Sequence, residues 1–121
     1  MPHHPRSPAR RLPFLGVILI SVVILFTPAS GVPTAPPGTD KLVHLALFTA
    51  LSATGRRAGF GAPALAAALL GYAAGSEVLQ GVLPLGRSAD PLDVAVNALG
   101  IALGLLLAFG ARRLGDWWDG R

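Results

Sequence analysis

Long uncharged apolar stretches dominate this sequence and decide which solvent it can fold in. Leu12 to Thr27 contains no charged residue, and further stretches rich in leucine and alanine follow it. Apolar residues make up 52% of the chain and charged residues only 13%, and the mean hydropathy is +0.58. A soluble fold of 121 residues could not bury so much apolar surface, because a short chain hides a limited fraction of what it exposes. We therefore expect an integral membrane protein with the lipid bilayer as its partner.

The net charge of +4 does not indicate nucleic-acid binding. Basic residues lie between the apolar stretches, without the aromatic interleaving on which single-stranded nucleic acid stacks. The chain has no cysteine, which excludes disulfides, thiolate metal sites and thiol nucleophiles. His3 and His4 are neighbours in a proline-rich tail and lack a third ligand, so we predict no metal site and no cofactor.

Prolines, glycines and capping residues divide the chain into four predicted helices. Pro28 ends the first apolar stretch, and Pro63 and Pro91 suit the first turns of the third and fourth helices. We predict an all-α integral membrane bundle of four transmembrane helices over residues 12–111. A disordered cytoplasmic tail at 1–11 and a cytoplasmic tail at 112–121 flank it. The helices span about 12–27, 40–54, 62–83 and 91–111.

The first apolar stretch also has a second interpretation. Its basic start and its Thr-Pro-Ala-Ser end suit a cleaved signal peptide, and Arg10-Arg11 weakly matches a twin-arginine signal. The stretch is near the lower limit of the roughly 17 to 25 residues that a spanning helix needs. It is nevertheless long for the apolar region of a signal peptide. We interpret it as a membrane helix and leave cleavage open.

The positions of the basic residues predict the orientation, because short cytoplasmic loops carry an excess of lysine and arginine. Only Lys41 and Arg87 fall on one side. On the other side fall Arg6, Arg10, Arg11, Arg56, Arg57, Arg112, Arg113 and Arg121. We predict a multi-pass protein of the cell membrane with both termini in the cytoplasm and the loops 28–40 and 84–90 outside.

Polar residues collect toward the outer ends of the last three predicted helices. An ionisable side chain in a membrane helix costs at least a few kcal/mol and usually faces the bundle interior with a partner. Lys41 and Arg87 border this layer. Spacings of three or four residues place each set on one helix face: Asp40, His44 and Phe48; Glu77 and Gln80; Asp93 and Asn97.

Each of these residues also has a purely structural interpretation. An aspartate at a helix start can cap the helix or complement its dipole, and we leave Asp90 out of the site for that reason. Lys41 can extend to the headgroups, and His44 can bond a neighbouring backbone. Glu77 is the hardest to explain in this way, since the alternative is a buried ion pair with a nearby cation.

Two Gly-x-x-x-Gly pairs predict close packing between helices. They are Gly71 with Gly75 and Gly100 with Gly104. Small residues let neighbouring backbones approach where burial in lipid gives no hydrophobic driving force between helices. Gly104 falls on the Asn97 side of its helix, which supports an inward position for that face.

The order of these elements resembles the VanZ-like membrane family. The matching pattern covers Asp40 to Gly104: Asp40-Lys41-x-x-His44-x-x-x-Phe48, Glu77-x-x-Gln80, Arg87, and Asp93-x-x-x-Asn97-x-x-Gly100-x-x-x-Gly104. The resemblance implies a small multi-helix bacterial membrane protein. The family's namesake is associated with low-level resistance to teicoplanin, a glycopeptide that targets wall precursors, so the resemblance implies a role in the cell envelope.

Three functions agree with this pattern. The first is binding of an anionic envelope ligand, a lipid-linked wall precursor or a lipid headgroup, with Lys41 and Arg87 on its phosphate. The second is an enzyme with Glu77 or Asp93 and His44 as acid and base, which the lack of a serine elbow, a metal-ligand set or a phosphate loop disfavours. The third is a structural subunit of an envelope complex, and a homo-oligomer stays open. The predicted ligand-binding set is Asp40, Lys41, His44, Glu77, Gln80, Arg87, Asp93 and Asn97.

Overall fold

The computed structural model describes residues 8–28, 36–86 and 89–118. A short 3-10 helix, η1 (Pro8–Arg11), leads directly into α1 (Leu12–Phe26). Three longer helices follow, α2 (Thr39–Ala58), α3 (Ala62–Val82) and α4 (Pro91–Trp118). The described part of the chain is therefore all-helical, which confirms the predicted fold class.

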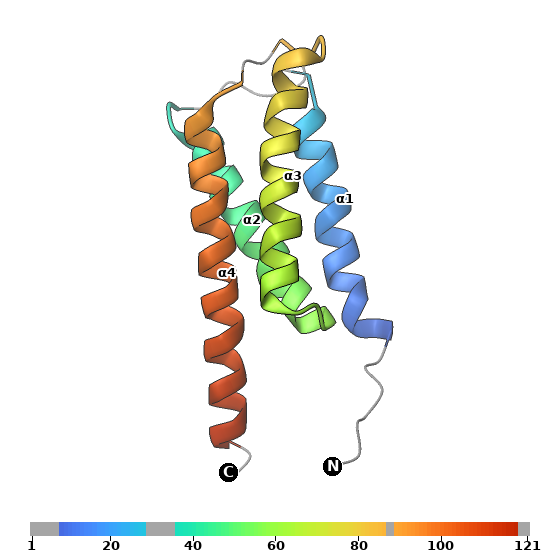
Figure 1. The fold of residues 1–121 in the computed structure, drawn as a ribbon, viewed down its shortest axis with the longest axis vertical. Coiled ribbons are helices and arrows are strands. Elements are labelled where there is room, and N and C mark those ends of the chain that lie inside the picture. Colours follow the sequence, from blue (N-terminus) through green and yellow to red (C-terminus); the bar gives the residue numbers. More distant parts are fainter. Residues whose placement is uncertain (1–7, 29–35, 87–88, 119–121) are drawn as a thin grey trace.

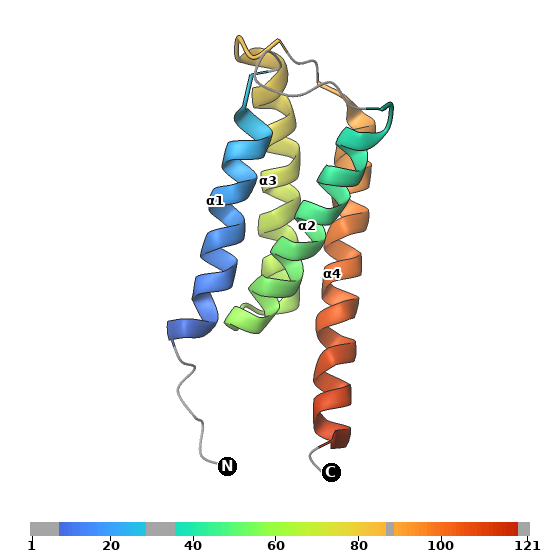
Figure 2. The ribbon, with the colours of Figure 1, turned by 180° about the vertical axis from the view of Figure 1, so that it is seen from behind.

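The helices lie side by side as one bundle (Figure 1). α1 and α3 begin at the end of the bundle at which α2 ends. Arg56 and Arg57 lie in the last turn of α2 there, so we call it the basic end. α2 and α4 begin at the opposite end, which we call the polar end (Figures 1 and 2). α2 crosses the bundle obliquely and contacts α1, α3 and above all α4. It is the helix around which the others pack.

The outside of the bundle is apolar, as the sequence predicts. Three helical segments are long and apolar enough to cross a membrane: Ala9–Phe26, Ala62–Val82 and Pro91–Ala111. Leucine, valine and isoleucine side chains on these segments are exposed, which suits contact with lipid. α2 does not meet this criterion, because it carries charged residues near both of its ends.

The apolar core lies where α2 meets the other helices. Phe48 and Leu51 of α2 are fully buried, and Phe48 lies against the Tyr72 ring of α3 with centroids 5.8 Å apart. α1 is joined to α3 by a hydrogen bond of 2.8 Å between the hydroxyls of Ser21 and Tyr72. The core comprises Leu25, Leu47, Phe48, Leu51, Leu65, Leu69, Ala73 and Ile101.

α2 continues to Ala58, four residues beyond the end predicted for it. Gly55 does not break the helix; it lies where α2 packs against α3, and a Cβ there would lie 2.8 Å from the Leu65 side chain. The helix ends instead at Gly59, whose φ of 111° is a left-handed conformation that favours glycine. The Gly59 N–H donates to the Arg56 carbonyl at 3.1 Å, which closes the last turn.

α4 continues to Trp118 instead of ending near residue 111. No proline interrupts this stretch, and Arg113 lies over the Phe109 ring at 5.7 Å, a pairing at i and i+4 that supports a helix. At 28 residues the helix is about 42 Å long. Its last turns extend past the other helices at the basic end (Figure 1).

The two Gly-x-x-x-Gly pairs behave differently. A Cβ on Gly100 would lie 2.7 Å from the Leu45 carbonyl oxygen of α2, and one on Gly104 would overlap the Ser52 side chain. This pair lets α4 approach α2 closely. Gly71 and Gly75 instead have nothing within 4 Å of such a Cβ. The packing predicted for them within this chain is wrong, because α3 buries another stripe: Leu65, Leu69, Ala73, Ser76, Glu77 and Gln80.

Candidate functional site

Four buried polar side chains meet at the polar end, and we call them the polar cluster. They are His44 of α2, Glu77 of α3, and Asp93 and Asn97 of α4. Their exposed fractions are 4%, 4%, 8% and 0% in that order. One nitrogen of His44 and one carboxylate oxygen each of Glu77 and Asp93 lie within 4.8 Å of one another. The spacing within each helix predicted that these faces turn inward, and three helices contribute to one spot.

His44 and Asn97 are joined directly. The Nδ1 of His44 lies 3.0 Å from the Asn97 Oδ1. An amide oxygen can only accept, so Nδ1 carries the hydrogen and donates it. This bond fixes the ring orientation and leaves the lone pair of the neutral imidazole on Nε2. His44 is thus held ready to accept a proton or to bind a cation through Nε2.

Glu77 joins α3 to the segment that leads into α4. The backbone N–H of Asp90 donates to Glu77 Oε1 at 2.6 Å. The second oxygen, Oε2, is buried with no hydrogen-bond partner, as is Nδ2 of Asn97. Buried polar groups are nearly always paired, so each such atom calls for an explanation. Within the part of the chain that the structure describes, the polar cluster is incompletely satisfied.

Lys41 lies beside the cluster and is already engaged by carboxylates. Its Nζ donates to Asp93 Oδ1 at 2.9 Å and to Asp90 Oδ2 at 3.0 Å. Two charge-assisted hydrogen bonds of this kind stabilise the ammonium form of Lys41. The lysine therefore stays charged and ties the first turn of α2 to the first turn of α4.

Asp90 belongs to this arrangement, although its position at a helix start predicts only a capping role. Its Oδ1 accepts from the Leu92 N–H at 3.0 Å, which is the capping role expected of it. Its other oxygen binds Lys41, and this bond is the main cause that lowers the pKa of the Asp90 carboxyl. The sequence signal was its position three residues before Asp93, which places both carboxylates on the same side of the chain.

Besides Lys41, two described members of the predicted ligand-binding set lie outside the cluster. Gln80 is buried, but its Nε2 donates to the Leu25 carbonyl at 2.7 Å, one of the last carbonyls of α1, which have no partner within their own helix. Asp40 is exposed, and its Oδ2 lies 3.8 Å from Lys41 Nζ. Arg87 lies outside the described residues.

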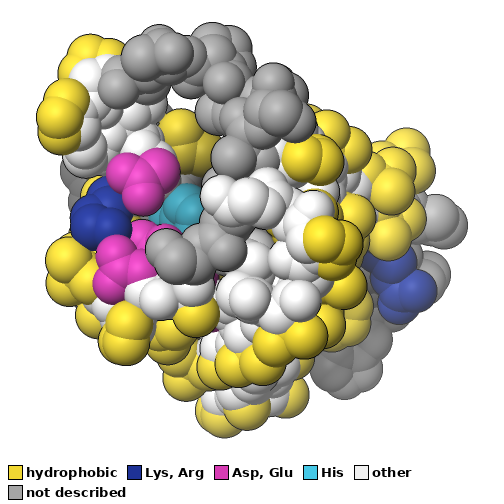
Figure 3. All heavy atoms as spheres, turned by 90° about the horizontal axis from the view of Figure 1, so that it is seen from above, with side chains coloured by type: hydrophobic (Ala, Val, Ile, Leu, Met, Phe, Trp, Pro, Cys, Tyr) yellow, Lys and Arg dark blue, Asp and Glu magenta, His cyan; other side chains and the backbone are white. Residues whose placement is uncertain are grey.

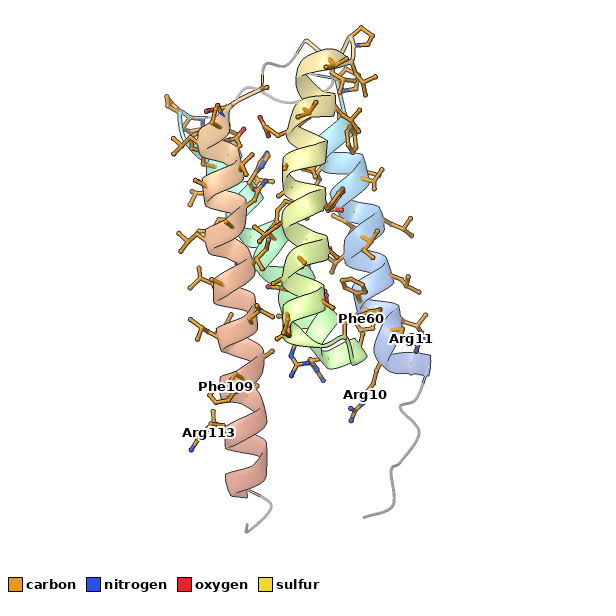
Figure 4. All side chains as sticks on the ribbon, viewed as in Figure 1. Arg10, Arg11, Phe60, Phe109 and Arg113 are labelled. Atoms are coloured by element: carbon orange, nitrogen blue, oxygen red, sulfur yellow. The ribbon has the colours of Figure 1, made fainter. Side chains whose placement is uncertain are left out.

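Charge is separated along the bundle. Seen from above, acidic, lysine and histidine side chains gather at one spot of the polar end (Figure 3). Arg10, Arg11 and Arg113 lie at the opposite end (Figure 4), and Arg56 and Arg57 occupy the last turn of α2 there. All acidic side chains that the structure describes are at the polar end. The polar cluster with its bordering groups is thus net acidic.

The sequence of the chain matches the model of a known protein family over residues 20–112, under the description VanZ/LLP1. The chain belongs to the VanZ/LLP1 family. The family match covers α2, α3 and most of α4, and hence every residue of the polar cluster. No curated protein and no solved structure matches the chain. Family membership and the apolar helices together make this a VanZ-like membrane protein.

Proposed function

We propose that this VanZ-like protein binds the polar headgroup of an envelope lipid, of the lipid-linked wall precursor class, at the polar cluster. Its main support is the pair of buried polar atoms without a partner, Glu77 Oε2 and Asn97 Nδ2. A ligand that pairs with both would remove the cost of leaving them unsatisfied, about 1–3 kcal/mol for each group. The surrounding exterior is apolar, so a lipid can reach this end of the bundle from the bilayer.

The proposed orientation puts the polar end on the outer side of the cell membrane. The arginines at the basic end support it, because Lys and Arg are retained in cytoplasmic segments. The cluster then lies at the depth of the outer headgroups, where lipid-linked wall precursors expose their phosphate and sugar groups. The chain would be a multi-pass protein with both termini in the cytoplasm.

The cluster offers different groups to such a headgroup. Asn97 Nδ2 can donate to a phosphate or hydroxyl oxygen, and Glu77 Oε2 can accept from a sugar hydroxyl or amide. The role expected for Lys41 changes, because two aspartates already occupy its ammonium. It serves first to neutralise them, and the phosphate contact proposed for Arg87 becomes the more important one.

Native mass spectrometry of the purified protein in nanodiscs tests lipid binding. A polyprenyl phosphate is the probe, and the same polyprenyl alcohol without phosphate is the control lipid. We expect the phosphate form to bind and Asn97→Ala to weaken its binding about 10-fold or more, because a hydrogen bond to a charged group is lost. Asp40→Asn, an exposed position outside the cluster, should bind like wild type. Equal binding of both lipids, or no effect of Asn97→Ala, would refute the proposal.

The same site would support low-level resistance to teicoplanin-type glycopeptides, by holding the wall precursor that these compounds target. In a sensitive bacterium, expression of the wild-type chain should raise the inhibitory concentration of teicoplanin. Expression of Asn97→Ala at the same protein level should not. Resistance that follows protein level alone, whatever the variant, would contradict this role.

Acid–base catalysis on such a lipid is a second candidate, and the bond between His44 and Asn97 favours it. An imidazole held in one orientation beside two carboxylates can take a proton from water as the water attacks a phosphate ester. A leaving alcohol would then receive its proton from a protonated acid of the cluster. Release of inorganic phosphate from a lipid phosphate by wild type, lost in Glu77→Gln, would support this. Purified protein that leaves such lipids unchanged would exclude it.

A further inference from the structure

Three side chains of the polar cluster place atoms of the kinds that bind metal ions close together. His44, Glu77 and Asp93 come from three different helices and offer one nitrogen and two carboxylate oxygens within 4.8 Å of one another. Donors around a single tetrahedral zinc ion lie about 2.0–2.1 Å from it and thus roughly 3.4 Å apart. Small side-chain adjustments bring the three atoms to that spacing. We propose that His44, Glu77 and Asp93 hold one divalent transition-metal cation of the Zn²⁺ or Mn²⁺ class.

The buried state of Glu77 points independently to a ligand. Its Oε1 is fixed by the Asp90 N–H, while its Oε2 is buried without a partner. A carboxylate held by one oxygen and unsatisfied at the other is a suitable metal ligand, because the cation replaces the missing hydrogen-bond donor. The donor set of one imidazole and two carboxylates suits zinc and manganese, and it leaves open coordination positions.

Asn97 occupies the position of a supporting residue around such a site. Histidine ligands almost always donate their other ring N–H to an oxygen acceptor, which fixes the tautomer and directs the second nitrogen at the metal. In His44 the bond from Nδ1 to Asn97 Oδ1 at 3.0 Å would have this role and would leave Nε2 for the metal. Support of a histidine ligand would explain why Asn97, an asparagine in a membrane helix, is fully buried.

The charges around the cluster match a divalent cation. Lys41 takes Oδ1 of Asp93, which leaves Oδ2 of the same carboxylate as a metal ligand. Leaving aside the exposed Asp40, the described carboxylates of Glu77, Asp90 and Asp93 and the ammonium of Lys41 together leave two negative charges when all are ionised. A divalent cation would neutralise these charges. Its open positions would then attract a phosphate group to a site that is otherwise acidic.

Metal titration of the full-length chain in detergent tests the site. His3→Ala and His4→Ala are made in every variant and the affinity tag carries no histidine, so that the tail contributes no ligands. Isothermal titration with Zn²⁺ after chelator treatment should give one site per chain. Glu77→Gln should weaken it at least about 100-fold, and Asn97→Ala about 10- to 100-fold, as found for residues that support metal ligands. Asp40→Asn, the matched loss of one carboxylate at the same end, should leave the affinity unchanged.

A second measurement needs no substitution within the polar cluster. Pulsed electron paramagnetic resonance of Mn²⁺ bound to the same background chain should show coupling to one histidine nitrogen, and only His44 remains to supply it. A stoichiometry of zero, equal affinity in Glu77→Gln, or bound Mn²⁺ without nitrogen coupling would each overturn the proposal. No lipid-linked ligand is present in these experiments, so their failure would leave the proposed headgroup binding standing, and the reverse also holds.

Discussion

At the scale of single residues, one lysine holds together groups that would otherwise repel one another. Lys41 binds Asp90 and Asp93, and Asp93 is buried. A buried carboxylate that loses its cation is strongly disfavoured in a membrane protein. Removal of Lys41 alone should therefore lower the stability of the fold more than removal of both Lys41 and the Asp93 charge.

Lys41→Met should lower the thermal unfolding temperature of the purified protein. Lys41→Met combined with Asp93→Asn should recover part of that loss, because the uncompensated charge disappears with its partner. The double-mutant cycle, measured by thermal unfolding in detergent, gives the coupling between the two side chains. Strictly additive losses would show that the pair contributes nothing as a pair.

The lowered pKa of Asp90 predicts how stability depends on pH. A carboxylate whose pKa is lower in the folded state stabilises the fold fully above its unfolded pKa of about 3.9 and loses this effect as pH falls through the folded value. Wild type should thus lose stability more steeply than Asp90→Asn as the pH falls below about 4. Unfolding midpoints measured across this range provide the comparison. Parallel curves for the two proteins would count against the ion pair.

At the scale of helices, the packing of α4 on α2 depends on the absence of side chains. Gly100 and Gly104 allow this contact, whereas Gly71 and Gly75 face outward from α3. The sequence presents both pairs with the same spacing, so sequence alone could not tell which pair is buried. The difference follows from the buried stripe of α3, which only the packing of the whole bundle decides.

Gly104→Ala should destabilise the bundle by roughly 1–3 kcal/mol, because its methyl group would overlap Ser52 and the Thr49 carbonyl. Gly75→Ala adds the same methyl group at the second glycine of the other Gly-x-x-x-Gly pair. There the methyl group meets no neighbouring atom. It should leave stability unchanged or slightly raised, since alanine favours a helix more than glycine does. Unfolding of the two variants in the same detergent measures the contrast. Equal losses would mean that the outward face of α3 is also packed.

The C-terminal end of α1 depends on one side chain of α3. Gln80 donates to the Leu25 carbonyl inside the bundle, and replacement by leucine leaves that oxygen buried without a partner. Gln80→Leu should cost about 1–3 kcal/mol of stability. Headgroup and metal binding should change little, since Gln80 has no bond to the cluster. Loss of Zn²⁺ binding in a folded Gln80→Leu protein would instead place Gln80 in the site.

At the scale of the whole molecule, the sequence predicted the class of fold and the end at which polar residues meet. Apolar stretches and turn residues define the four helices, and spacings of three and four residues bring His44, Glu77 and Asp93 to inward faces. Which side chains bond to each other across the helices could not be predicted in the same way. The bonds between Lys41 and Asp90 and between Gln80 and α1 are examples. Both depend on how far apart the helices are and on how they are rotated. Helix ends were missed at Gly55, which lies within α2, and after residue 111, where α4 continues into a more polar stretch.

Reporter fusions test the proposed orientation. A reporter active only in the cytoplasm should give signal when fused after Gly59 or after the last residue, and none when inserted at residue 35. The reason is the arginines at the basic end, which are retained inside. The reverse pattern would place the polar cluster on the cytoplasmic side and exclude a ligand of the outer leaflet.

α2 is less apolar than its neighbours, and this has a consequence for how the protein is made. With charged residues near both ends and polar ones on its inner side, α2 has little tendency to remain in lipid alone. The helix that covers its polar side, α4, is synthesised last. We therefore expect a nascent chain to keep α2 at the bilayer surface until α4 leaves the ribosome, so that the final helix draws the second one into place.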